Sequence, residues 1–323
     1  MKFFDYFYRE ELTLEGPWQQ NWDLFFSSWD GSDRVRRVFS HVGADKKFWV
    51  VHPEYGIASQ ELPHEPTFVA QGGEAEAMQG VIGHAKGLCS IEQSRVCVDI
   101  TGMLRPHIAI LLRLLKHIGV KKFDAIYSEP KSYARHERTK FSSEEVFDVR
   151  EITGFEGINM PGAQEVLIVA PGFDEVLLRE VYSHKASALR YQLFGLPSLK
   201  ADMYQQNILR TYGIDTPMPD NETASTIRFA SASDPFAVAT ELSAIISGAQ
   251  KRKHRSRFYI APLGPKAQML GAALYYLSES NNVAVSLIYP VVSGHEAGTS
   301  SGISKVAINT VDFKLLDVIS ARH

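Results

Sequence analysis

The chain has 323 residues, of which 45% are hydrophobic and 22% are charged. This composition excludes a disordered or fibrous chain and predicts one large or two ordinary globular domains. The formal net charge of −3 excludes a general attraction to nucleic acid or to anionic membranes, so any site for an anion must be local.

The sequence favours a cytoplasmic protein. Its two cysteines, Cys89 and Cys97, are too few for a disulfide framework, and we interpret them as buried thiols in a reducing compartment. Charged residues interrupt the apolar N-terminus, so no signal peptide is expected. No run approaches 18 apolar residues, which predicts that no segment spans a membrane.

The first half of the chain alternates short apolar runs with amphipathic stretches, after an aromatic arm at the N-terminus. We expect strands over residues 24–29, 47–51, 67–70, 96–100 and 123–127, and helices over residues 33–42, 74–88 and after Gly102. Strands alternating with helices are typical of a parallel α/β sheet.

The second half follows the same order. We expect strands over residues 166–170, 189–194 and 226–230 and on either side of the helix that follows Gly264, further helices over residues 174–184, 200–212 and 234–248, and a last antiparallel strand over residues 304–313. Gly102 matches Gly264 and Tyr127 matches Tyr289, and both pairs are separated by 162 residues (264 − 102 and 289 − 127).

This repeat predicts an α/β fold with two tandem Rossmann-like units, each with a mainly parallel sheet, produced by internal duplication. The first unit, with the N-terminal arm, is expected over residues 1–160 and the second over residues 161–323. The two units are expected to face one another as a pseudo-dimer, with a ligand in the cleft between them.

Ligands bind open parallel sheets at the carboxyl ends of the strands, where backbone N–H groups at helix starts attract phosphate. The polar residues, glycines and cations that the sequence places at this edge are the candidate ligand-binding residues. They are Asp30, Ser32, Gly72, Thr101, Gly102, Arg105, Ser128 and Glu129 in the first half, and Gly172, Gly264, Lys266 and His295 in the second.

The segment from Thr101 to Arg105 is the sharpest of these candidates. Glycine allows a phosphate to approach the backbone, threonine offers a hydroxyl group, and Arg105 lies in the first turn of a helix. Arg135 adds positive charge from a basic loop after the fifth strand. The alternative is that Gly102 serves strand–helix packing and that the cations are simply solvated.

Several common sites are not predicted. The sequence has no P-loop and no G-x-G-x-x-G fingerprint, and its histidines and carboxylates show no metal-binding spacing such as H-E-x-x-H. We therefore expect neither a metal site nor a cofactor.

The segment from Asp99 to Gly102, followed by a cation and an apolar helix, resembles the fourth-strand motif of the CRISPR-associated Rossmann-fold (CARF) sensor domains. Two such units in one chain resemble the SAVED sensors. The resemblance implies a cyclic or linear oligonucleotide ligand. It covers only a short stretch of each half, and the chain departs from the family where Met103 and Leu104 precede Arg105.

We therefore expect a sensor subunit for a nucleotide-type second messenger, which acts in antiviral defence through a protein effector or as a homo-oligomer. Neither a membrane nor duplex nucleic acid is an expected partner. One alternative is an enzyme acting on a phosphorylated small molecule, with Glu129 or Asp30 as the base. Another is a structural subunit of a larger assembly.

Overall fold

The computed structural model describes residues 4–15, 18–133, 146–200, 203–213, 226–252, 255–292 and 300–321. The chain divides into two compact units. The N-terminal unit comprises Phe7–Ser143 and Gly294–Leu315, and the C-terminal unit comprises Met1–Tyr6, Glu144–Ser293 and Leu316–His323. The division expected from the sequence repeat, between residues 160 and 161, stays a prediction.

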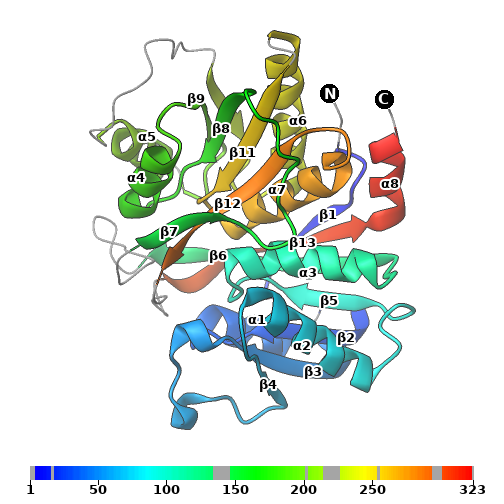
Figure 1. The fold of residues 1–323 in the computed structure, drawn as a ribbon. Coiled ribbons are helices and arrows are strands. Elements are labelled where there is room, and N and C mark those ends of the chain that lie inside the picture. The colour runs from blue at the N-terminus through cyan, green and yellow to red at the C-terminus, as the bar shows by residue number, and fades with distance from the viewer. Residues whose placement is uncertain are drawn as a thin grey trace. The chain divides into compact units, whose positions relative to one another are not determined.

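The N-terminal unit is built on a seven-stranded sheet (Figure 1). Its strands, in spatial order, are β1 (Arg9–Leu12), β13 (Ser300–Asp312), β6 (Lys122–Tyr133), β5 (Val96–Asp99), β2 (Asn21–Ser28), β3 (Gly43–Val51) and β4 (Thr67–Val69). The five strands from β6 to β4 are parallel. Numbered along the chain, these five have the order 3-2-1-4-5, which is the order of the first five strands of a six-stranded Rossmann sheet.

Three helices follow strands of this sheet: α1 (Asp33–His41), α2 (Glu74–Leu88) and α3 (Arg105–His117). Two short 3-10 helices, η1 (Pro53–Tyr55) and η2 (Ser59–Glu61), lie between β3 and β4. In α3 the buried residues Ile108, Leu111, Leu112 and Leu115 recur every three or four positions, which gives the helix an apolar face. This face holds the start of α3 at the carboxyl end of β5. Pro106 lies in the first turn of the helix, where proline is well tolerated.

The C-terminal unit has a six-stranded sheet with the same parallel order. Its strands are β10 (Ile227–Ala230), β9 (Leu189–Gly195), β8 (Gln164–Ala170), β11 (Ser256–Pro262), β12 (Val285–Val292) and β7 (Val146–Glu151). Its helices are α4 (Glu175–His184), α5 (Met203–Gly213), α6 (Pro235–Arg252) and α7 (Lys266–Glu279). In both units an antiparallel strand, β13 or β7, pairs with the fifth parallel strand.

The predicted fold class is confirmed: the protein is α/β, with two mainly parallel sheets that are consistent with two tandem Rossmann-like units. The antiparallel strand expected over residues 304–313 is β13. Five of the described elements were not predicted from the sequence: the strands β1 and β7, the last helix, α8 (Phe313–Ala321), and the two 3-10 helices, η1 and η2. β1 reads REEL and lies at a sheet edge, so it lacks the apolar run that marks an interior strand.

The core of the N-terminal unit is rich in aromatic side chains. The rings of Phe39 and Trp49 stack with their centroids 4.0 Å apart, and Trp29 meets Trp49 edge-on at 5.0 Å. Such rings bury large apolar areas, so they fix α1 on β2 and β3. Among the described residues, no helix has both the length and the apolar character that a membrane span requires.

Candidate functional site

The candidate site lies at the carboxyl edge of the parallel strands in the N-terminal unit. The strand order reverses between β2 and β5, since their other neighbours are β3 and β6. A topological switch point of this kind is where open α/β sheets bind ligands. α1 begins after β2 and α3 begins after β5, so two helix starts flank this point.

At the switch point Gly102 packs directly against the end of β2. A Cβ atom at this position would lie 2.0 Å from the carbonyl oxygen of Ser28. No side chain fits there, so close packing by itself requires the glycine. The carbonyl group of Gly102 accepts a hydrogen bond from the Tyr55 hydroxyl, at 2.8 Å.

Behind this contact a buried polar network joins three strands. The Asp99 carboxylate accepts hydrogen bonds from the Ser27 hydroxyl (3.0 Å) and from the Thr101 backbone N–H (2.9 Å). The Thr101 and Ser128 hydroxyls lie 3.1 Å apart, and the Ser128 N–H donates to the Thr101 hydroxyl. Thr101 and Ser128 are fully buried, so both hydroxyls hold the strand ends together.

Burial raises the pKa of Asp99, and the hydrogen bonds from Thr101 and Ser27 only partly offset it. The charge of Arg34 also acts to lower the pKa of Asp99. The edge therefore contains a buried carboxyl group that senses the charge of a buried guanidinium group.

The start of α1 carries two buried donors that have no acceptor. Ser32 is the N-cap residue, but its hydroxyl caps no backbone N–H and has no hydrogen-bond partner among the described residues. Arg34 donates from Nη1 to the Ser128 carbonyl at 2.6 Å, whereas its buried Nε has no partner there. Ser32 was predicted as a site residue, and Arg34 was not.

Asp30 precedes α1 and lines a pocket of about 660 Å³, to which Arg36, Phe39 and Ser40 of that helix also contribute. Its carboxylate accepts a hydrogen bond from the Ser32 N–H at 2.9 Å. The rings of Trp29 and Trp49 line the same pocket, together with Glu61. This pocket thus combines aromatic side chains with carboxylate groups, and Asp30 connects it to the end of β2.

The other predicted residues of the N-terminal unit lie at the same edge. Arg105 is half-buried at the first position of α3, and Glu129 is buried in β6 immediately after Ser128. Gly72 lies before α2 with a φ of +79°, a conformation that favours glycine. Its neighbour Gly73 donates its backbone N–H to Glu76 at 3.0 Å.

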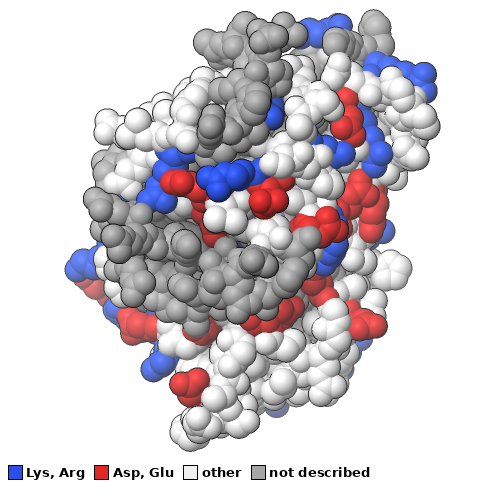
Figure 2. Space-filling model, turned by 60° about the vertical axis from the view of Figure 1, so that its left-hand side comes forward, with Lys and Arg blue, Asp and Glu red and all other residues white. Residues whose placement is uncertain are grey.

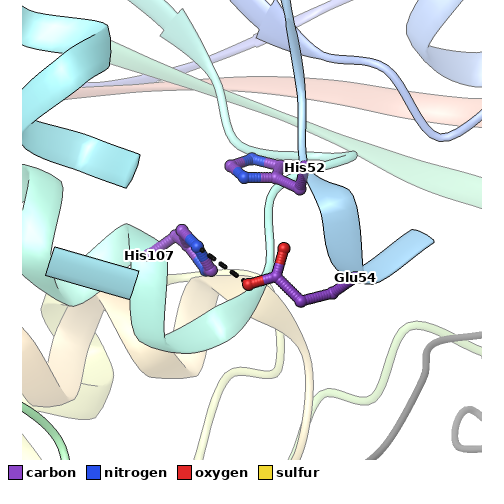
Figure 3. A group of neighbouring side chains, drawn as sticks. All are labelled: His52, Glu54 and His107. Carbon is purple, nitrogen blue, oxygen red and sulfur yellow. Dashed lines mark ion pairs between the residues drawn. The ribbon is translucent and has the colours of Figure 1, made fainter. Parts of the chain in front are cut away.

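A group that the sequence did not predict lies beside the switch point: His52, Glu54 and His107 (Figure 3). Each offers one possible ligand atom, and these atoms all lie within 4.8 Å of one another. Nε2 of His107 is 3.5 Å from Oε1 of Glu54. Both imidazoles are buried. The Glu54 side chain is 29% exposed, so it is the part of this group that solvent reaches.

Burial raises the pKa of Glu54, and the negative charge of Glu74 adds to this effect, whereas a backbone hydrogen bond opposes it. The signal for the group was present in the sequence only in part. His52 and Glu54 follow one strand with one residue between them, and His107 lies in the first turn of a helix that follows another strand. The parallel order brings those two strand ends to one edge.

In the C-terminal unit the switch point lies between β8 and β11. A Cβ atom on Gly172 would lie 2.3 Å from the carbonyl oxygen of Leu263, so this switch point is also closed by a glycine. Gly264 packs under the amide of Gln268, and Lys266 begins α7. Both amide atoms of Gln268 are buried without a hydrogen-bond partner among the described residues.

The predicted residues thus fall into two groups, one at the edge of each sheet. Arg135 and His295 lie outside the described residues. On the face drawn in Figure 2, Lys and Arg atoms are interspersed with Asp and Glu atoms, so the described residues there form no broad patch of one charge.

The fold and its sheet edges define the class as a two-unit Rossmann-like α/β protein. No protein-family model and no curated protein matches the chain. Solved structures that match include "GsuK channel bound to NAD" and "GsuK Channel", each 11% identical over 96% of this chain and 81% of that chain. The TM-scores are 0.18 and 0.19, too low to support a conclusion about fold or function.

Proposed function

We propose that the protein binds a nucleotide-type ligand at the carboxyl edge of the N-terminal unit and acts as a sensor subunit through a partner protein. One observation carries the proposal. Ser32 and Arg34, at the start of α1, have buried donor atoms without an acceptor among the described residues. Leaving such donors unsatisfied is costly, and a phosphate oxygen would satisfy them.

The surroundings of α1 fit such a ligand. The N-terminus of a helix attracts phosphate through its backbone N–H groups and its dipole, and here it lies at a topological switch point. The nearby pocket offers the Arg36 guanidinium, which lies over the Trp29 ring and on which a base can stack, and the Asp30 carboxylate, which accepts hydrogen bonds. Arg105 would add positive charge at the start of α3.

Not every predicted residue would touch the ligand in this proposal. The Thr101 and Ser128 hydroxyls are engaged with one another, and Gly102 is packed against Ser28. These residues would position the strand ends, whereas Ser32, Arg34, Asp30 and Arg105 would make the contacts. The contribution of the C-terminal unit, through Gly172, Gly264 and Lys266, and the ligand cleft between the units stay predictions.

A thermal-shift screen of cyclic and linear oligoribonucleotides tests the proposal. A ligand that binds only the folded protein raises Tm, by an amount that grows with its concentration. We expect Ser32→Ala and Arg105→Ala to reduce this shift. Arg113→Ala is the matched control, because Arg113 is exposed two turns further along α3 and should leave the shift unchanged.

Ser32→Ala is the sharper variant, because the hydroxyl makes no hydrogen bond that the folded protein would lose. Its Tm without ligand should therefore stay close to that of the unmodified protein. A screen without any shift would refute the proposal. A shift followed by consumption of the ligand would instead favour an enzyme, with Asp30 or Glu129 as the base.

A further inference from the structure

We propose that His52, Glu54 and His107 bind a divalent transition-metal ion, with Zn²⁺ as the ion that best suits them. Two imidazole nitrogens and a carboxylate oxygen are the donor set of many zinc sites with three protein ligands. The three candidate ligand atoms lie within 4.8 Å of one another, so a small side-chain movement would bring all of them onto one ion. The proposal does not depend on the nucleotide-type ligand.

The carboxylate has capacity for a cation. Oε1 of Glu54 lies 3.5 Å from His107, whereas Oε2 is buried and accepts no hydrogen bond among the described residues. A buried carboxylate oxygen without a donor is costly, and a metal ion compensates for this cost directly. Glu54 is also the most exposed of the three side chains, so it marks the side from which an ion could enter.

One of the ligands, His52, is oriented by a hydrogen bond with a neighbouring side chain. The Ser28 hydroxyl lies 2.8 Å from Nε2 of His52, and a metal bound at Nδ1 would leave this hydrogen bond intact. Such a partner fixes the orientation of a ligating imidazole. Figure 3 shows the His52 ring, the His107 ring and the Glu54 carboxylate as close neighbours. The centroids of the two imidazole rings are 4.5 Å apart.

The backbone supports the same arrangement. Glu54 lies in η1, and the hydroxyl of the adjacent Tyr55 donates to the carbonyl of Gly102, just before the helix that carries His107. Gly102 itself packs against Ser28, which holds His52. The two segments that supply the ligands are therefore held together by contacts that need no metal, so an ion would have to adjust only the side chains.

The alternative is an imidazole–carboxylate ion pair that needs no metal. The test uses the full chain, stripped with a chelator and titrated with Zn²⁺ by calorimetry and with Co²⁺ by visible absorption. We expect one ion per chain and a rise in Tm. The Co²⁺ complex should show the absorption of a low-coordinate site and two metal-shifted imidazole signals in its NMR spectrum.

Variants assign the site. His107→Ala and Glu54→Gln should weaken metal binding at least tenfold, and Ser28→Ala by about 10- to 100-fold, because it frees the orientation of His52. His117→Ala, at the exposed end of the same helix, is the matched control and should bind as the unmodified chain does.

The ion-pair alternative predicts neither calorimetric heat nor a Co²⁺ spectrum from the unmodified chain. If the unmodified chain gives no calorimetric heat, or no Co²⁺ spectrum, the proposal is overturned. This test does not need the histidine variants to fold. Metal binding that survives unchanged in the folded His107→Ala variant would overturn it as well. If the chain binds the metal but no nucleotide raises its Tm, only the proposed function is refuted.

Discussion

At the scale of single residues, Gly102 shows how packing and ligand binding favour the same residue type. The sequence allowed both explanations. The structure supplies one sufficient reason for glycine, because a Cβ atom would lie 2.0 Å from the Ser28 carbonyl oxygen. The backbone at Gly102 and the backbone at Ser28 are therefore in contact where β5 and β2 end, and a ligand at this edge would lie against this contact.

This contact predicts that Gly102→Ala destabilises the protein by about 1–3 kcal/mol, because β2 and β5 must move apart at their ends. Gly83 is the matched control. It lies in α2 with no atom near its missing Cβ, so Gly83→Ala should stabilise by about 0.5–1 kcal/mol. Urea denaturation of both variants measures the difference. Equal free energies of unfolding for the two variants would contradict the close contact between Gly102 and Ser28.

Asp99 predicts a specific pH dependence of stability. Since burial raises its pKa in the folded protein, the folded state binds this proton more tightly than the unfolded state. The contribution of Asp99 to stability is therefore greatest below the ordinary pKa of aspartate, and it falls as the pH rises through the folded-state pKa.

Asp99→Asn should abolish this fall, because asparagine keeps an acceptor and carries no charge. We expect the variant to gain stability relative to the unmodified protein as the pH rises from about 4 towards 7. Denaturation midpoints across this range measure the effect. A stability difference that does not change with pH would contradict the assignment. Asp148→Asn is the exposed control.

At the scale of elements, the C-terminal unit is tied together by a polar cluster near the start of β8. Glu165 accepts hydrogen bonds from Lys185, at the end of α4, and from Tyr259 in β11, at 2.9 and 2.8 Å. Burial alone raises the pKa of Glu165, but Lys185 and Tyr259 outweigh burial, so the pKa lies below its usual value.

A lowered pKa in the folded state stabilises the protein above the unfolded-state pKa of glutamate, and this stabilisation is lost as the pH falls through the folded-state pKa. Lys185→Met should therefore cost stability at pH 7, by less than about 1 kcal/mol because the pair is partly exposed. The cost should shrink in acid. Lys86→Met, which breaks the more exposed pair with Glu92, provides the comparison.

The elements also show what the sequence could predict. The interior strands and α3 were predicted because they are long apolar runs between turn residues. β1 and β7 contain charged residues and lie at sheet edges, where only one neighbour supplies hydrogen bonds. Their pairing depends on β13 and β12, and no local pattern encodes it.

At the scale of the whole molecule, the two cysteines can report on how the N-terminal unit opens. Cys97 is fully buried in β5, and burial raises the pKa of its thiol well above the usual value, whereas Cys89 is partly exposed. We expect Cys89 to react rapidly with a thiol reagent and Cys97 to react only when this sheet opens.

If opening is in rapid equilibrium, the reaction of Cys97 should accelerate in Gly102→Ala by about tenfold for each 1.4 kcal/mol of stability lost. Cys89→Ser isolates this slow phase. Two equally fast thiols in the folded protein would contradict the burial of Cys97.

Much of the candidate edge could be predicted from the sequence, since parallel strands in sequence order place Ser32, Thr101 and Arg105 at their carboxyl ends. The His52–Glu54–His107 group could not, because the spacing between Glu54 and His107 reflects two intervening elements and no motif. Arg34 was missed because it stands among other charged residues at the start of α1, where a solvated side chain is the usual outcome.

The position of β13 has a consequence for synthesis on the ribosome. β6 ends at residue 133, and its antiparallel neighbour begins at residue 300. At about 5–20 residues per second, roughly 10–30 s pass between the two. During that time β6 is an edge strand with unpaired backbone groups, which can pair with other chains. A chaperone would therefore protect this protein most during the interval between synthesis of β6 and synthesis of β13.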